Sequence, residues 1–117
     1  MKIDEDLLFK VMNTVRRLPL FNKEYSDSDI YEMISEQTPC SPEQIKTYLL
    51  ILESEECLKL GTVNSDNTTE YVIIQVTRKG IEYTKNSISP ETIERINKVI
   101  DGVKTAAELF AVASKLF

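Results

Sequence analysis

Carboxylates are the chemically active side chains that gather most densely in this sequence. From residue 24 to residue 56 nine negative charges stand against one positive charge, a net charge of −8. The nine are Glu24, Asp27, Asp29, Glu32, Glu36, Glu43, Glu53, Glu55 and Glu56, and the single cation is Lys46. Glu55 and Glu56 are adjacent, and adjacent side chains on a helix diverge. The pair therefore does not predict acid–base catalysis.

The composition disfavours the common enzyme classes. The chain has no histidine, which removes Ser-His and Cys-His nucleophiles and imidazole metal ligands. Two cysteines, Cys40 and Cys57, do not make a zinc site, and three glycines do not supply a glycine-rich phosphate loop. We expect a non-enzymatic protein without a cofactor or a metal.

Length and hydropathy indicate one domain in a reducing compartment. At 117 residues the chain can bury one core. No apolar run approaches the ~20 residues of a membrane span, and the N-terminus lacks the order of a signal peptide. A cytoplasmic protein with no membrane contact is the expectation. A disulfide between the two cysteines is less favoured than a Cys57 that fills the core.

Helices are predicted first. An apolar stripe with three- and four-residue spacing predicts a helix over residues 4–18, which Pro19 ends. Ser26 is the expected N-cap of a helix over residues 27–37. The sequence Ser41-Pro42-Glu43-Gln44 combines a cap, a first-turn proline and a capping box, so a further helix should run to about Glu55. Two short helices joined by a tight turn are typical of a helix-turn-helix.

A hairpin and a helical tail are predicted next. Residues 57–63 and 70–76 are expected to form two strands, with turn-forming residues between them. A helix should start at Thr77, another at Ser89-Pro90, and a last one should cover residues 106–117. Phe21 and Tyr25, in the connection after the first helix, are expected to dock on the core. The fold expected is α+β and mostly helical: a winged helix-turn-helix over residues 1–88 and a helical extension over residues 89–117.

The stretch from Val76 to Tyr83 resembles a known family. In the small winged-helix proteins of bacteria and phages grouped as YjcQ-like domains, the second wing strand leads into a threonine, a glycine and then an aromatic residue or leucine. Thr77, Gly80 and Tyr83 fit that pattern. The resemblance implies the same fold and a helical tail, and it assigns no catalytic residues. Winged-helix regulators usually carry several cations on the second motif helix and the wing, whereas this chain has Lys46 alone on that helix.

The first functional hypothesis is a transcriptional regulator that binds double-stranded DNA. Base reading requires exposed donors on the second motif helix, and phosphate contacts require cations nearby. The candidates are Gln44, Lys46 and Thr47 on that helix, with Arg16, Arg17, Arg78 and Lys79 outside it. The last four act together only if the end of the first helix and the start of the helix after the wing lie on one side. Gln44 is also explained as a capping residue and Lys46 as a solvated charge.

The alternative is an acidic interaction or inhibitor module that keeps the fold without binding DNA. Carboxylates along helix faces attract a basic protein partner, with strong salt dependence. The candidates are Glu32, Glu36, Glu43, Glu53, Glu55 and Glu56. A solvated acidic face that only keeps the protein soluble is the competing explanation.

The tail is apolar almost all round, which predicts burial on more than one face. We expect either a homodimer contact or a tail that folds back on the first helix. The dimer candidates are Leu109, Phe110, Val112, Leu116 and Phe117.

Overall fold

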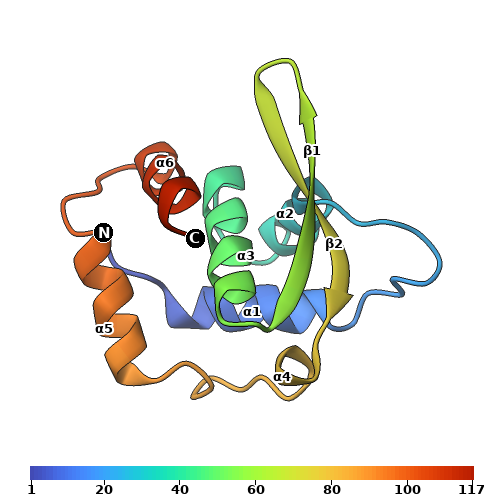
Figure 1. Cartoon of the computed structure of the whole chain (residues 1–117), viewed down its shortest axis with the longest axis horizontal. Helices are drawn as coiled ribbons and strands as arrows, with labels where there is room; N and C mark the ends of the chain where they lie inside the picture. Colours follow the sequence, from blue (N-terminus) through green and yellow to red (C-terminus); the bar gives the residue numbers. More distant parts are fainter.

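The computed structural model describes all 117 residues as an α+β arrangement, about half of it helical (Figure 1). The elements are α1 (Glu5–Val15), α2 (Asp27–Ser35), α3 (Pro42–Ser54), β1 (Leu58–Ser65), β2 (Thr68–Val76), α4 (Arg78–Ile81), α5 (Pro90–Val99) and α6 (Ala106–Leu116). None of the six helices combines the length and the apolar character needed to cross a membrane.

Local capping determines where α2 and α3 begin. The backbone amide of Ser26 donates to the Asp29 carboxylate, and the Ser26 hydroxyl accepts from the Asp29 amide. Ser41 and Gln44 exchange the same two bonds at the start of α3, each 3.1 Å long. Each box satisfies amides that a helix N-terminus leaves without partners. Both predicted caps are therefore confirmed.

The two strands form an antiparallel hairpin that projects from the helices (Figure 1). Their pairing runs from Leu58 opposite Val76 to Ser65 opposite Thr68, which confirms the predicted hairpin and lengthens it. The chain just before α2 also lies against β2, because the Ile73 amide donates to the carbonyl of Tyr25 at 2.9 Å. This contact fixes the base of the hairpin next to α2.

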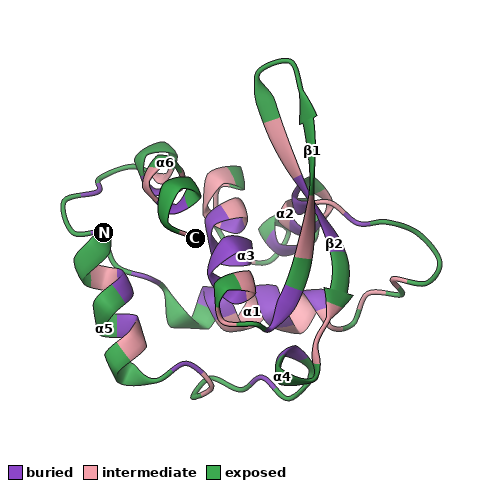
Figure 2. Cartoon of the chain, viewed as in Figure 1, coloured by how far each residue is buried: buried purple, intermediate pink, exposed green.

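One buried cluster of 23 side chains draws on both ends of the chain (Figure 2). It contains apolar residues of α1, α2, α3 and the hairpin together with residues of α5 and α6. The N-terminus is tied to the same region: the Met1 ammonium donates to the Val103 carbonyl and the Ile3 amide to the Asn97 side chain, both at 2.8 Å. Residues 89–117 therefore pack on the core that residues 1–88 build.

Each residue of the motif after β2, which consists of Thr77, Gly80 and Tyr83, has a structural role. The Thr77 hydroxyl accepts from the Gly80 amide and caps α4. A Cβ atom at Gly80 would lie 2.0 Å from the carbonyl oxygen of Cys57, so only glycine permits this approach. Tyr83 is buried and stacks on Phe9 at 6.2 Å between ring centroids. The three residues attach the end of the hairpin to α1.

Three local predictions are wrong or incomplete. Phe21 does not dock on the core; its side chain is 90% exposed, whereas Tyr25 is buried as expected. The helix at Thr77 is a single turn, because Tyr83 packs inward and the following residues form a turn. The first helix ends at Val15, three residues before the predicted end.

Candidate functional site

The face of α3 that points away from α1 is covered. A helix turns about 100° per residue, so Thr47 and Leu50 lie opposite the core residues Ile45 and Leu52. Solvent would reach Thr47 and Leu50 unless another element lay over them, yet they are only 0% and 6% exposed. The element that packs on α3 is α6 (Figure 1). It covers the face that a winged helix-turn-helix would present to a DNA groove.

Lys46 is held inside the chain and is not a solvated charge. Its Nζ donates to the Thr69 carbonyl of β2 at 2.9 Å and lies 5.4 Å from the ring centroid of Phe110 on α6. The Asp27 carboxylate of α2 is 4.0 Å away. With its side chain 21% exposed, Lys46 connects four elements and is not free to reach a phosphate.

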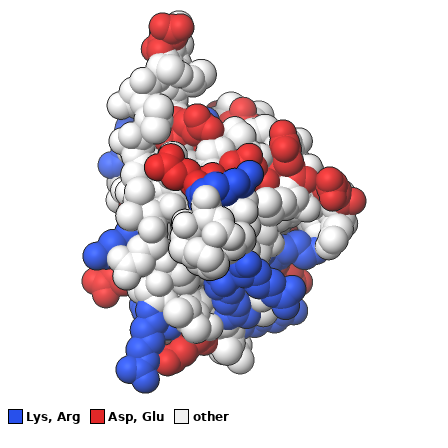
Figure 3. All heavy atoms as spheres, turned by 90° about the vertical axis from the view of Figure 1, so that its right-hand side faces the viewer, with Lys and Arg blue, Asp and Glu red and all other residues white.

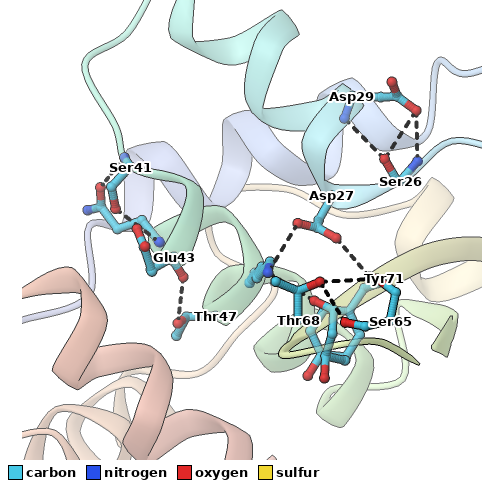
Figure 4. Close-up of polar contacts among 12 residues, drawn as sticks. Ser26, Asp27, Asp29, Ser41, Glu43, Thr47, Ser65, Thr68 and Tyr71 are labelled. Carbon is cyan, nitrogen blue, oxygen red and sulfur yellow. Dashed lines mark hydrogen bonds and ion pairs between the residues drawn. The ribbon is translucent and has the colours of Figure 1, made fainter. Parts of the chain in front are cut away.

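Asp27 of α2 contacts both Lys46 and the hairpin (Figure 4). It is 2% exposed and accepts from the backbone amide of Tyr71 at 2.7 Å. Desolvation raises the pKa of Asp27 above its ordinary value, and the Tyr71 amide and the Lys46 charge oppose that rise. The Tyr71 ring meets Phe110 edge to face at 6.3 Å.

We call Asp27, Lys46, Tyr71 and Phe110 the hairpin clamp, because they join α2, α3, β2 and α6. Sequence reasoning did not find it. A carboxylate in the first turn of a helix is explained by the helix dipole alone, so nothing local pairs Asp27 with Lys46.

Each of the three candidates for base reading forms a hydrogen bond within the chain. Thr47 is fully buried and donates its hydroxyl to the Glu43 carbonyl at 2.8 Å, so its predicted exposure is wrong. Gln44 is engaged in the capping box. Lys46 belongs to the hairpin clamp, and the prediction of an accessible lysine is also wrong.

The end of α1 and the start of α4 lie side by side (Figure 1). Arg16 Nη1 donates to the carbonyls of Ile81 at 3.2 Å and Tyr83 at 2.6 Å, so this arginine joins the two segments. Arg78 and Lys79 are paired with Glu82 and Glu55. Arg17 is exposed and has no ion pair. Three of the four predicted cations thus have partners within the chain, whereas Arg17 is unpartnered and lines a cleft between α1 and α2.

The six predicted acidic residues fall into separate groups. Glu53 accepts from the Leu60 amide at 2.6 Å, and Glu55 pairs with Lys79 at 3.9 Å. Glu53 and Glu56 line a shallow cleft of about 470 Å³ beside three cations, Lys59, Arg78 and Lys79. This end of α3 is thus mixed in charge and is not an acidic surface. Glu43, at the other end of α3, is half-buried.

Glu32 on α2 and Glu36 at its C-cap are exposed and form no ion pair, and unlike the exposed Glu56 they do not line the cleft that holds three cations. The side of the molecule on which the α1–α2 loop lies shows acidic side chains gathered in its upper half and basic ones below (Figure 3). Glu32 and Glu36 thus give α2 two acidic side chains that a partner can reach.

The tail folds back on α3, not on the first helix as one hypothesis expected. Leu109 is fully buried in its own chain, and Phe110, Val112 and Phe117 are half-buried. Leu116 is 57% exposed. Four of the five predicted dimer residues thus already have contacts within one chain.

The remaining reactive groups do not form a site. Both cysteines are free thiols, and Cys57 is buried as predicted, with its pKa raised by desolvation. No group of three or more histidine, cysteine or carboxylate side chains is arranged to hold a metal ion. Comparisons with family models, curated proteins and solved structures found no match to this chain.

Proposed function

We propose that this chain is a winged helix-turn-helix protein that acts through protein contacts on α2 and does not read DNA bases with α3. The order α1, α2, α3, hairpin supports the fold. The isolated bridge of Ser26 to Val72 supports it further, because it places the chain before α2 beside the second strand of the wing. The roles of Thr77, Gly80 and Tyr83 support a relationship to YjcQ-like proteins.

The observation that carries the proposal is the position of α6 over α3. Groove reading needs side-chain donors that reach base edges. Thr47 is buried, Lys46 donates to the Thr69 carbonyl, and the Gln44 side-chain oxygen accepts from the Ser41 amide in the capping box. Thr47 and Lys46 are therefore engaged within the chain, which leaves the side-chain amide group of Gln44 as the donor available for base reading among the three candidates.

The surface left for a partner is acidic. Glu32 and Glu36 lie one turn apart on the exposed side of α2, and the whole chain carries a net charge of −5. Such a surface raises the encounter rate with a cationic protein and repels nucleic acid. The partner class is a basic protein.

Matched charge reversals test the acidic surface. We expect Glu32→Lys with Glu36→Lys to reduce capture of a basic protein from lysate at least about tenfold at low salt, because two attractive charges become repulsive. The control is Glu91→Lys with Glu94→Lys on α5, which changes the net charge equally, from −5 to −1. If both double variants lose the partner equally, net charge and not α2 determines capture. If neither loses it, α2 is only a solvated face.

One observation favours a second candidate, DNA binding through the backbone alone. Arg16 joins the end of α1 to α4, so the segment that carries Arg17 lies next to the turn that carries Arg78 and Lys79. Fluorescence anisotropy with a mixed-sequence duplex at low salt distinguishes the two functions. The protein-contact proposal expects no binding. If the chain binds the duplex in a salt-sensitive way, and the double variant Arg17→Glu with Arg78→Glu loses that binding, the protein-contact proposal is wrong and DNA-backbone binding takes its place.

A further inference from the structure

Phe21 is the most exposed large apolar side chain of the protein, at 90%. It lies in the turn after α1, where the Asn22 amide donates to the Pro19 carbonyl at 3.0 Å. A hydrogen-bonded turn holds the ring outward, although the core is nearby. An exposed aromatic side chain of this kind is typical of the anchor residues of protein interfaces.

A cleft opens beside this turn, between α1 and α2. It has a volume of about 350 Å³ and a mixed lining, in which Leu18, Met33 and Ile34 are apolar and Lys10, Asn13, Thr14, Arg17 and Gln37 are polar. A cavity of about 150 Å³ is enough to hold a benzene ring. Phe21 follows Leu18 by three residues but leaves this cleft of its own chain empty.

Two opposite charges flank these features and have no partner within the chain. Arg17 is exposed at the cleft, and Glu24 is exposed on the loop that carries Phe21. None of the five ion pairs of the protein includes either residue. Lys23, between Phe21 and Glu24, turns its ammonium over the ring of Tyr25 at 4.8 Å. Glu24 is thus the free charge of this loop.

We propose that two copies of this chain associate through this face, with Phe21 of each copy in the α1–α2 cleft of the other and Glu24 next to Arg17 across the interface. A projecting ring beside a cleft, and an acid beside a base, are self-complementary under a two-fold rotation. The mixed charge of this side of the molecule fits such an arrangement (Figure 3).

An interface of standard size would cover only a small share of the surface. A stable interface covers about 800 Å² on each partner, which is about a ninth of the 7017 Å² surface of this chain. Glu32 lies about 100° around α2 from Met33, which lines the cleft, whereas Glu36 is the neighbour of Met33 at three residues' spacing and borders the proposed interface.

Sedimentation equilibrium over a range of concentrations tests the role of Phe21. We expect a reversible dimer, and Phe21→Ser should raise its dissociation constant at least about tenfold, because an aromatic anchor is lost. Leu116→Ser, at the exposed position on α6, is the matched control and should leave the constant unchanged. A protein that stays monomeric at every concentration overturns the proposal, and so does a dimer that depends on Leu116 and not on Phe21.

A charge swap tests the pairing itself. Arg17→Glu places two acids opposite each other at both contacts, and Glu24→Arg places two bases there, so each variant alone should be monomeric. An equimolar mixture restores both attractive pairs and should form a heterodimer. Circular dichroism of each variant checks that the exposed substitutions leave the fold intact. If the mixture stays monomeric while the wild type dimerises, the proposed arrangement of the two copies is wrong.

Discussion

Asp27 and Lys46 show what single residues contribute to this molecule. Each would ordinarily be a solvated charge, but both lie between the hairpin and the helices. Their geometry satisfies the polar atoms: Asp27 accepts from Tyr71, Lys46 donates to Thr69, and no buried side-chain polar atom in the protein lacks a partner. A buried acid without such partners would destabilise the fold. Asp27 and Lys46 therefore hold the hairpin in position against the helices.

The raised pKa of Asp27 predicts a pH dependence of stability. The folded chain holds the Asp27 proton at pH values where the unfolded chain has released it, so unfolding in that window releases a proton and acid favours the folded state. The window lies above the ordinary carboxyl pKa of about 3.9. The wild-type protein should therefore gain stability relative to the Asp27→Asn variant as the pH falls from about 7 towards the ordinary carboxyl pKa.

Urea unfolding of both proteins at each pH measures this difference. The asparagine can still accept from the Tyr71 amide, so the variant isolates the charge. A difference that grows in the opposite direction would mean that Lys46 and Tyr71 stabilise the carboxylate more than burial disfavours it.

At the scale of elements, α6 determines what α3 can do. A helix with apolar residues on several sides needs cover on several sides, and α1 and α2 supply only one. Leu109 and Ala113 of α6 are fully buried in this contact. The inner side of the apolar tail is thus explained by packing within one chain, while Leu116 on its outer side is 57% exposed.

Two leucines on α6 distinguish packing from self-association. Leu109→Ala should lower the free energy of unfolding by about 2–5 kcal/mol, because it leaves a cavity at a fully buried position. Leu116→Ala should change it by no more than about 0.5 kcal/mol, since the side chain is 57% exposed. Chemical denaturation of the two variants checks this. Equal losses would mean that the outer side of α6 is also covered in solution.

At the scale of the whole molecule, the two ends of the chain meet. The N-terminal ammonium contacts Val103, and one core cluster includes Val11 of α1 and Ile100 after α5. Segments that share a core unfold together unless the contacts between them are few. Residues 1–88 and the extension of residues 89–117 follow each other along the chain as expected. Their side chains nevertheless pack into one shared core.

Native-state hydrogen exchange checks this cooperativity. The amides of Val11 and Ile100 should exchange with the same free energy of opening, because both open only on global unfolding. An extension that opens at much lower free energy would be an independent unit, and the cover over α3 would then be transient.

Sequence alone determined the elements whose causes are local. Ser26 and Ser41 begin helices through bonds that span three residues, Pro42 occupies the first position of α3, and the alternation of turn formers and β-branched residues specifies the hairpin. The same sequence did not determine which charged and apolar side chains are accessible. Accessibility depends on what covers a residue, and Lys46 is covered by Phe110, which follows it by 64 positions. Only tertiary packing buried Thr47 under α6 and left Phe21 outside, because residue type sets a preference for burial but not the position of distant elements.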